Sequence, residues 1–216
     1  MKSYQGDGIT VSYDVKKCIH ARRCVLGLPK VFDSTATPRI QAQNAPAGEI
    51  VDIVRACPSG ALQYELDDGP QEYPPHTNTM RIWENGPLEL RGDLEIEGVG
   101  KMNRVLLCRC GMTGNAPFCD NSHRKGFTAT GVPGPNEAKA AEIDHCDGPV
   151  EVGIRENGPY MIRGKVEVIG GDGSQVAKVE KVSLCRCGAA GDKPFCTGNH
   201  RDIGFVKPVR AETDGE

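Results

Sequence analysis

Apolar and polar residues alternate with a period of two in two separate stretches of this chain, which is the pattern of a β-strand with one buried face. The alternating apolar residues are Leu88, Leu90, Leu94 and Ile96 in the first stretch and Ile162, Val166 and Val168 in the second. Each stretch follows an Asn-Gly pair, which favours a tight turn between paired strands. The pattern therefore predicts short antiparallel strands and hairpins in both places.

These stretches are parts of an internal repeat. The sequence RIWENGPLELRGDLEIEG (81–98) resembles GIRENGPYMIRGKVEVIG (153–170), and each copy leads into CRCG. The copies are offset by 72 residues at ENGP (Glu84 to Glu156) and by 77 at the cysteines (Cys108 to Cys185). The second copy therefore holds five extra residues, which we place in the loop-forming stretch GGDGSQ at 170–175.

A different pattern precedes the repeat. The segment Ile9–Tyr13 predicts a strand, and Gly48–Cys57 predicts a helix with an apolar stripe. Leu62, Tyr64 and Leu66 alternate as a final strand. We expect the order strand, loop and helix, strand, helix, strand in this part of the chain.

Two breaks divide the chain. The Pro-rich stretch DDGPQEYPPHT (67–77) is typical of a linker, and a weaker break lies at 131–148. The expected class is α+β, with a small α/β unit followed by two small β-rich units. The expected domains are 1–70, 78–130 and 148–210.

Composition suggests what stabilises such small units. Aromatic residues make up 5% of the 216 residues and apolar residues 38%, so three independent cores would be thin and would need staples such as bound metal. The start of the sequence has no secretory signal pattern and the chain has no run long enough to span a membrane, so we expect a cytoplasmic protein. In that reducing compartment ten cysteines indicate metal binding more than disulfides. The net charge of −3, with both signs interspersed, argues against a nucleic-acid-binding face.

One ligand frame, C-x-C-x8-C-x3-H, occurs twice. Its residues are Cys108, Cys110, Cys119 and His123 in the first copy, and Cys185, Cys187, Cys196 and His200 in the second. Three thiolates and one imidazole make a complete four-point cage for a metal centre, so the frame predicts two bound centres. Structural zinc sites also use three Cys and one His, but they usually pair thiolates as C-x2-4-C. The C-x-C spacing favours iron-sulfur over zinc.

The full motifs, CRCGMTGNAPFCDNSH and CRCGAAGDKPFCTGNH, resemble the CDGSH iron-sulfur domains, whose pattern is C-x-C-x2-[ST]-x3-P-x-C-D-G-x-H. The first copy keeps Thr113, Pro117 and Asp120 and has Asn121 where the family has Gly. The second copy keeps Pro194 and Gly198 and has Ala190 for Ser/Thr and Thr197 for Asp. The resemblance implies one 2Fe-2S cluster per motif, and two β-rich units that pack as a pseudo-dimer about an intramolecular pseudo-two-fold axis in a monomeric chain.

Residue chemistry agrees with this assignment. Thiolates are soft ligands suited to iron and sulfide, and replacing one thiolate by a neutral imidazole makes a centre less negative and easier to reduce. Arg109 and Arg186 lie inside the C-R-C stretches, where they either offset the negative charge of a cluster or are solvated surface residues. Trp83 and Tyr160 are expected to fill the thin core rather than to take part in chemistry.

Three more cysteines, Cys18, Cys24 and Cys57, keep the spacing of a ferredoxin C-x2-C-x2-C run with a distant C-P, but Ala21 occupies the middle position. From about Val11 to Leu66 the chain resembles divergent single-cluster ferredoxins. The resemblance implies a ferredoxin-like unit that holds either a 3Fe-4S cluster or a 4Fe-4S cluster with a fourth ligand other than Cys. His20 is the candidate for that ligand, and a surface position is the alternative for it. The alternative for the three cysteines is simple burial in a small core.

These inferences combine into a functional hypothesis. We expect an electron-transfer protein with three iron-sulfur centres that acts with redox partner proteins and binds neither nucleic acid nor membranes. The sequence has no nucleophile elbow, phosphate-binding loop or dinucleotide fingerprint, so we do not expect an enzyme. A cluster donor or a redox or pH sensor would use the same ligands. A zinc-stabilised interaction module is a further alternative.

Overall fold

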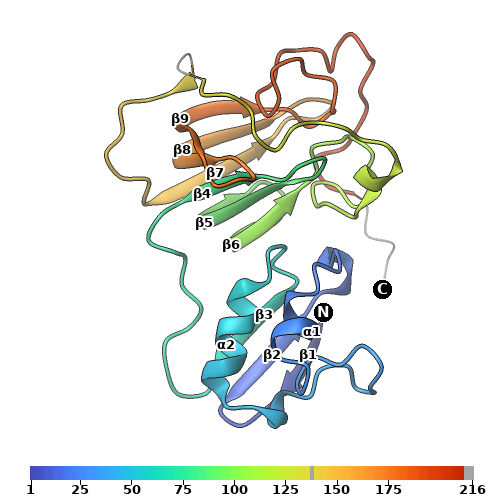
Figure 1. Cartoon of the computed structure of the whole chain (residues 1–216), viewed down its shortest axis with the longest axis vertical. Helices are drawn as coiled ribbons and strands as arrows, with labels where there is room; N and C mark the ends of the chain where they lie inside the picture. The colour runs from blue at the N-terminus through green and yellow to red at the C-terminus, as the bar shows by residue number, and fades with distance from the viewer. Residues whose placement is uncertain (137–138, 212–216) are drawn as a thin grey trace. The chain divides into compact units, whose positions relative to one another are not determined.

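The computed structural model describes residues 1–136 and 139–211. Contacts within the chain divide it into two compact units, one covering Met1–Tyr73 and the other the residues from Pro74 onward. The division falls inside the Pro-rich stretch, where the chain between β3 and β4 has no regular structure (Figure 1).

The first unit is a three-stranded antiparallel sheet, in the order β1-β2-β3, with short helices beside it (Figure 1). Its elements are β1 (Lys2–Gln5), β2 (Ile9–Tyr13), η1 (Val15–Lys17), α1 (Arg23–Gly27), η2 (Ala42–Asn44), α2 (Ala47–Ala56) and β3 (Leu62–Leu66). Val11 of β2 and Ile50 and Val54 of α2 are fully buried in a common core. Ile50 and Val54 lie four residues apart, so they fall on one face of the helix and hold it against the sheet.

The predicted strands at Ile9–Tyr13 and Leu62–Leu66 and the predicted helix are confirmed, although the helix begins one residue earlier and ends one residue earlier than expected. The predicted middle strand is wrong, because the chain there makes only an isolated bridge between Phe32 and Ile40. The intervening sequence DSTATPR is rich in turn-forming residues, which compete with a strand for the backbone hydrogen bonds. Strand β1 was not predicted.

The second unit contains both copies of the repeat. Its strands are β4 (Thr79–Ile82), β5 (Leu88–Ile96), β6 (Gly100–Leu107), β7 (Pro149–Ile154), β8 (Tyr160–Ile169) and β9 (Gln175–Leu184), and a 3-10 helix, η3 (Ser122–Lys125), follows the first set of cysteines. Each copy forms three consecutive antiparallel strands, and the two predicted alternating stretches are the middle strands, β5 and β8. Asn85 and Asn157 take left-handed φ angles in the turns before the second strands, which Asn tolerates better than most residues.

The strands of the two copies also pair with each other. Strand β4 lies antiparallel to β5 of its own copy and parallel to β8 of the other. Strand β7 lies antiparallel to β8 and parallel to β5, so the pairing is reciprocal. Both first strands therefore lie between β5 and β8, and the apolar faces of the two copies form one core (Figure 1).

The extra residues of the second copy lengthen its hairpin. Strands β8 and β9 have 10 residues each, whereas β5 has 9 and β6 has 8. The turn in the second copy, Gly170 to Ser174, is also longer than the turn at Glu97 to Val99. The prediction that placed all five in the GGDGSQ loop is therefore only partly right, because the strands take up part of the insertion.

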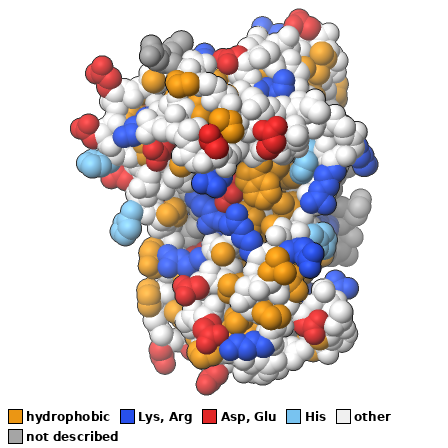
Figure 2. Space-filling view, viewed as in Figure 1, with side chains coloured by type: hydrophobic (Ala, Val, Ile, Leu, Met, Phe, Trp, Pro, Cys, Tyr) orange, Lys and Arg blue, Asp and Glu red, His pale blue; other side chains and the backbone are white. Residues whose placement is uncertain are grey.

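Acidic and basic side chains are interspersed on the face shown in Figure 2, together with some hydrophobic side chains. The exposed large hydrophobic side chains include Val15, Leu26 and Val206. Among the described residues, no helix is long and apolar enough to cross a membrane.

Candidate metal centres

The first centre comprises Cys108, Cys110, Cys119 and His123. Cys108 follows directly after β6, and His123 lies in η3. The thiol sulfurs of Cys108 and Cys110 are 3.5 Å apart, and Cys119 Sγ lies 3.4 Å from His123 Nδ1. The three cysteines are buried and the histidine is half-buried. The side chains thus form two pairs, one at the end of the strand and one spanning the start of the 3-10 helix.

The second centre, which comprises Cys185, Cys187, Cys196 and His200, repeats this arrangement after β9. The sulfurs of Cys185 and Cys187 are 3.9 Å apart, and Cys196 Sγ lies 3.6 Å from His200 Nδ1. The structure thus brings the four predicted residues of each motif together as two pairs, not as a single four-point cage. Within residues 1–136 and 139–211, no three His, Cys, Asp or Glu side chains converge tightly enough to hold one metal ion.

The paired arrangement fits a binuclear cluster. Each iron of a 2Fe-2S unit takes two protein ligands, so the two pairs of a motif match the number of donors that such a unit requires. The donor set of three thiolates and one imidazole suits iron bridged by sulfide. All ten cysteines are free thiols, so none of the proposed ligands is tied up in a disulfide.

The loop between the ligands of the first centre is held by its own side chains. The Thr113 hydroxyl donates to the carbonyl of Phe118 at 2.7 Å, and the Asp120 carboxylate accepts from the backbone N–H groups of Gly114 and Ser122, both at 2.9 Å. These bonds fix the backbone on both sides of Cys119. They also lower the pKa of Asp120 overall, although its partial burial acts in the opposite direction.

The departures from the family pattern leave this backbone geometry in place. Asn121 stands where the family has Gly and takes φ 71°, a left-handed angle that Asn tolerates. Gly198 occupies the equivalent position in the second motif with φ 92°. Thr197, in place of Asp, still accepts a hydrogen bond from the N–H of Gly191, at 3.3 Å. The second motif therefore keeps the bond to the residue after the third cysteine, but it lacks the carboxylate charge and, with Ala190 in place of Thr113, the hydroxyl donor.

Arg109, between two ligands of the first centre, is buried, with 1% of its surface exposed. Its guanidinium donates to the carbonyls of Trp83 at 2.7 Å, Gly86 at 2.9 Å, Thr130 at 3.1 Å and Ala129 at 3.3 Å. Burial lowers the pKa of Arg109 to about 10, which still leaves it charged at neutral pH. Arg109 therefore ties the C-x-C stretch to the turn before β5.

Arg186 does the same in the second centre. It is 3% exposed and donates to the carbonyls of Arg155, at 3.1 Å, and Pro208. The alternative that Arg109 and Arg186 are solvated surface residues is wrong. Each instead holds a buried positive charge, and the nearby Cys185 and Cys110 raise the pKa of Arg109 against the effect of its burial.

The two C-x-C stretches touch each other through glycine. A Cβ added to Gly111 would lie 2.7 Å from the carbonyl oxygen of Cys187, and one added to Gly188 would lie 2.8 Å from that of Cys110. Both glycines also have left-handed φ angles, 77° and 83°. The close approach requires residues without a side chain, and it brings a ligand of each centre next to the other centre's glycine.

Tyr160, the first residue of β8, is fully buried. Its hydroxyl oxygen lies 2.9 Å from the carbonyl oxygen of Cys108 and 3.1 Å from that of Pro117. Burial and the neighbouring Cys108 raise the pKa of Tyr160, whereas Arg186 opposes the rise, so the hydroxyl remains a donor at neutral pH. The sequence predicted a core role for this residue, and its contact with the other repeat's cysteine loop depends on how the two repeats pair.

The N-terminal centre comprises Cys18, Cys24 and Cys57. Cys18 follows η1, Cys24 lies in α1 and Cys57 follows α2, and all three line a cavity of about 170 Å³. Ala21 and His20 also line it, but the His20 side chain is exposed. His20 takes a left-handed φ of 55°. The structure therefore brings the three predicted cysteines to one cavity, with His20 at its rim.

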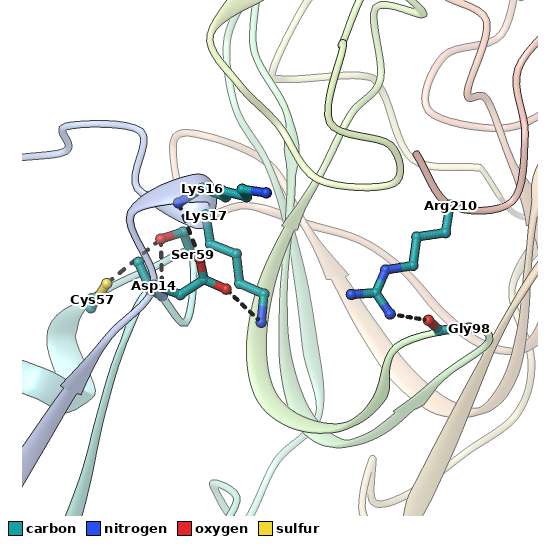
Figure 3. Close-up of polar contacts among 8 residues, drawn as sticks. Asp14, Lys16, Lys17, Cys57, Ser59, Gly98 and Arg210 are labelled. Carbon is teal, nitrogen blue, oxygen red and sulfur yellow. Dashed lines mark hydrogen bonds and ion pairs between the residues drawn. The ribbon is translucent and has the colours of Figure 1, made fainter. Parts of the chain in front are cut away.

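Side chains beside this cavity approach the thiols. Ser59 Oγ lies 3.7 Å from Cys57 Sγ, within range of a weak hydrogen bond (Figure 3). On the strand side, Asp14 pairs with Lys17 at 3.4 Å and accepts from the N–H of Lys16, which closes the turn before Cys18 (Figure 3). Burial and a hydrogen bond with Cys18 raise the pKa of Tyr13.

Burial also shapes the protonation of the ligands in the metal-free chain. It raises the pKa of Cys119 to about 12 and raises that of Cys24, while it lowers the pKa of His123. Cys119 and Cys24 therefore hold protons in the absence of a metal centre, whereas a hydrogen bond with Cys110 lowers the pKa of Cys108 to about 6. Loading would release the protons because the thiolate is the binding form.

Comparisons with known proteins agree with this division of the chain. Residues 4–67 match the family described as divergent 4Fe-4S mono-cluster, and residues 85–124 and 157–201 match the family described as iron-binding zinc finger CDGSH type. The uncharacterized protein YjdI of Escherichia coli strain K12 is 33% identical over 63 residues, which cover 29% of this chain and 83% of that protein. The YjdI protein of strain O157:H7 matches with the same figures. No solved structure matches the chain.

The two matched CDGSH segments each contain one complete Cys3His set, and the N-terminal match contains all three remaining candidate cysteines. The chain therefore belongs to the CDGSH iron-sulfur family, with two copies of the motif joined to an N-terminal divergent single-cluster ferredoxin domain.

Proposed function

We propose that this protein is an electron carrier in which the first and second centres each hold a 2Fe-2S cluster and the N-terminal centre holds a 3Fe-4S or 4Fe-4S cluster. The observation that carries the proposal is the presentation of three thiols and one imidazole as two close pairs, repeated in both motifs. Bound clusters would supply reversible one-electron transfer at each centre.

The surrounding residues suit that task. Buried Cys108, Cys110 and Cys185 keep water from one side of each centre. Arg109 and Arg186 hold the C-x-C backbone in place through bonds to distant carbonyls, so the ligands need little rearrangement when charge changes. Their positive charge favours the more negative, reduced form.

The proposal includes a pseudo-two-fold arrangement of the CDGSH repeats within one chain. Support comes from the reciprocal pairing of β4 with β8 and β7 with β5, and from the matched approach of Gly111 to Cys187 and Gly188 to Cys110. We further propose a cytoplasmic monomer that exchanges electrons with redox partner proteins and has no substrate-converting activity of its own.

A second function, donation of 2Fe-2S units or sensing of pH, is favoured by one observation. His123 and His200 are half-buried at the edges of their centres, whereas most of the cysteines in the two motifs are buried. Acid can protonate a histidine that solvent reaches, and a protonated imidazole cannot remain a ligand.

Metal and sulfide analysis of anaerobically purified protein, with visible and EPR spectra, tests the proposal. We expect red-brown protein with charge-transfer absorption, and loss of part of that absorption in Cys119→Ser and Cys196→Ser variants. Cys146→Ser is the matched control, because Cys146 is buried outside the candidate centres. Colourless protein with stoichiometric zinc would contradict the iron-sulfur assignment.

Incubation with an apo-acceptor separates the two functions. A carrier keeps its absorption through repeated cycles of reduction and oxidation, whereas a donor loses it to the acceptor under mild conditions. Rapid transfer at neutral pH would favour the donor function over the carrier.

A further inference from the structure

The two repeats differ at one buried position close to the ligands. Leu88 pairs with Ile82 and Leu107 across the strands of the first repeat. Tyr160 pairs with Ile154 and Leu184 in the same way in the second repeat. Both side chains are fully buried, so the difference between them is a phenol with a hydroxyl in one repeat and an aliphatic side chain in the other.

The Tyr160 hydroxyl reaches out of its own repeat. It lies 2.9 Å from the carbonyl oxygen of Cys108, the first ligand of the first centre. The guanidinium carbon of Arg186, in the C-x-C stretch of the second centre, lies 5.7 Å from the Tyr160 ring centroid. One side chain therefore contacts the C-x-C stretches of both centres.

We propose that Tyr160 is a positioning residue that sets the reduction potential of the first centre apart from that of the second, by donating a hydrogen bond from the second repeat to the carbonyl of Cys108. This inference rests on the proposed function of the two centres as redox sites. Leu88, the counterpart of Tyr160, has no donor to offer the second centre.

The physical basis is electrostatic. A hydroxyl that donates to a ligand's backbone carbonyl draws electron density from that residue and directs the positive end of its dipole toward the centre. In a buried site such a dipole is screened little, so it stabilises the more negative, reduced state. The same bond fixes the backbone of Cys108 at the point where β6 ends.

A lysine near the ligand loop does not distinguish the two centres. Lys207 donates to the carbonyl of Thr113 in the first centre at 2.8 Å, and Lys193 donates to the equivalent carbonyl, that of Ala190, in the second. Both loops therefore have a nearby ammonium group. Asp120 of the first motif and Thr197 of the second occupy equivalent positions and differ in charge. A substitution at Tyr160 changes neither residue.

Potentiometric titration of the full-length holoprotein, followed by EPR and visible spectra, tests the proposal. His123→Cys and His200→Cys first assign the two couples, because each lowers the potential of its own centre. In Tyr160→Phe we expect the couple of the first centre to shift to lower potential, and by more than the couple of the second. Tyr64→Phe is the matched control, since it removes a hydroxyl from a buried tyrosine in the other unit.

A second substitution covers the case in which Tyr160→Phe does not fold. Site-specific replacement of Tyr160 by 3-fluorotyrosine keeps the shape of the ring and makes the phenol a stronger hydrogen-bond donor. We expect the first centre's couple to shift to higher potential, opposite to the shift in Tyr160→Phe.

Three outcomes would overturn the inference: unchanged potentials in loaded Tyr160 variants, equal shifts of both couples, or a shift confined to the couple assigned by His200→Cys. Each refutes the role of Tyr160 and leaves the redox function intact. Wild-type protein that holds no iron-sulfur cluster would refute the proposed function, and this inference with it.

Discussion

Each CDGSH repeat has one imidazole, that of His123 or His200, among its candidate ligands. A cysteine in place of that histidine replaces a neutral imidazole ligand with a negatively charged thiolate. We therefore expect His123→Cys and His200→Cys each to lower the potential of its own centre, by about 100 mV or more given the difference between histidine-ligated and all-cysteine clusters. Redox titration of each variant measures the shift.

The same substitutions should change acid lability. As the pH falls through about 6, protonation competes with metal for the imidazole, so the wild-type clusters should bleach faster there than at pH 8. The Cys variants should bleach more slowly at pH 6. The rate of absorbance loss at both pH values checks this, and rates unaffected by either substitution would show that these histidines are not ligands.

We expect Ala21 to determine whether the N-terminal cluster has three irons or four. It lines the cavity with Cys18, Cys24 and Cys57, at the position where a ferredoxin run has its middle cysteine. We expect oxidised wild-type protein to show the EPR signal of a 3Fe-4S centre. Ala21→Cys should convert it to a 4Fe-4S cluster that is EPR-silent when oxidised.

His20→Ala is the companion variant for this centre. The His20 side chain is exposed at the rim of the cavity, so its loss should leave the spectrum unchanged. An oxidation-resistant 4Fe-4S cluster in the wild type that disappears in His20→Ala would identify His20 as the fourth ligand.

The grouping of the candidate Cys and His ligands could be predicted from their spacing, but the residues that contact them could not. The frame of Cys and His is local in sequence, so a pattern reveals it. The partners of Arg109 are backbone carbonyls from Trp83 to Thr130, which any sequence supplies, so the choice between a buried and a solvated arginine depends on the fold. Tyr160 touches a ligand 52 residues away, and its core position gave no indication of that contact.

At the scale of elements, the contact between the two C-x-C stretches limits which substitutions are tolerated at Gly111. A Cβ there would meet the Cys187 carbonyl, so Gly111→Ala should destabilise the second unit by about 1–3 kcal/mol through overpacking and strain. Thermal unfolding of the loaded protein measures the loss.

Gly204→Ala is the matched control for this prediction. Gly204 also has a left-handed φ, 61°, but a Cβ there would meet nothing within 4 Å. The difference in stability between the two variants therefore separates the effect of the close approach from that of backbone strain. Equal destabilisation would show that the contact between the two stretches contributes nothing.

Period-two alternation predicted the hairpins of both repeats because each strand buries one face in the shared core. It failed where burial does not alternate. Strand β1 has four residues, none of them fully buried, so it leaves no apolar signal. Between Phe32 and Ile40 the pattern predicted a strand that does not form. Phe32 and Ile40 are both buried and make one isolated bridge, but the residues between them form turns.

For the whole molecule, the reciprocal pairing makes each CDGSH repeat incomplete by itself. Strand β4 pairs with β8 and β5 pairs with β7, so a fragment from Thr77 to Thr130 would leave these edges and the apolar face between them exposed. We expect this fragment to be unstable or to form a homodimer in which a second copy replaces the missing repeat. A fragment of residues 74–211, which keeps both repeats, should be monomeric and bind two clusters. Sedimentation and cluster content check both fragments, and a well-folded monomer of the short fragment with one stable cluster would contradict the idea that the repeats complete each other.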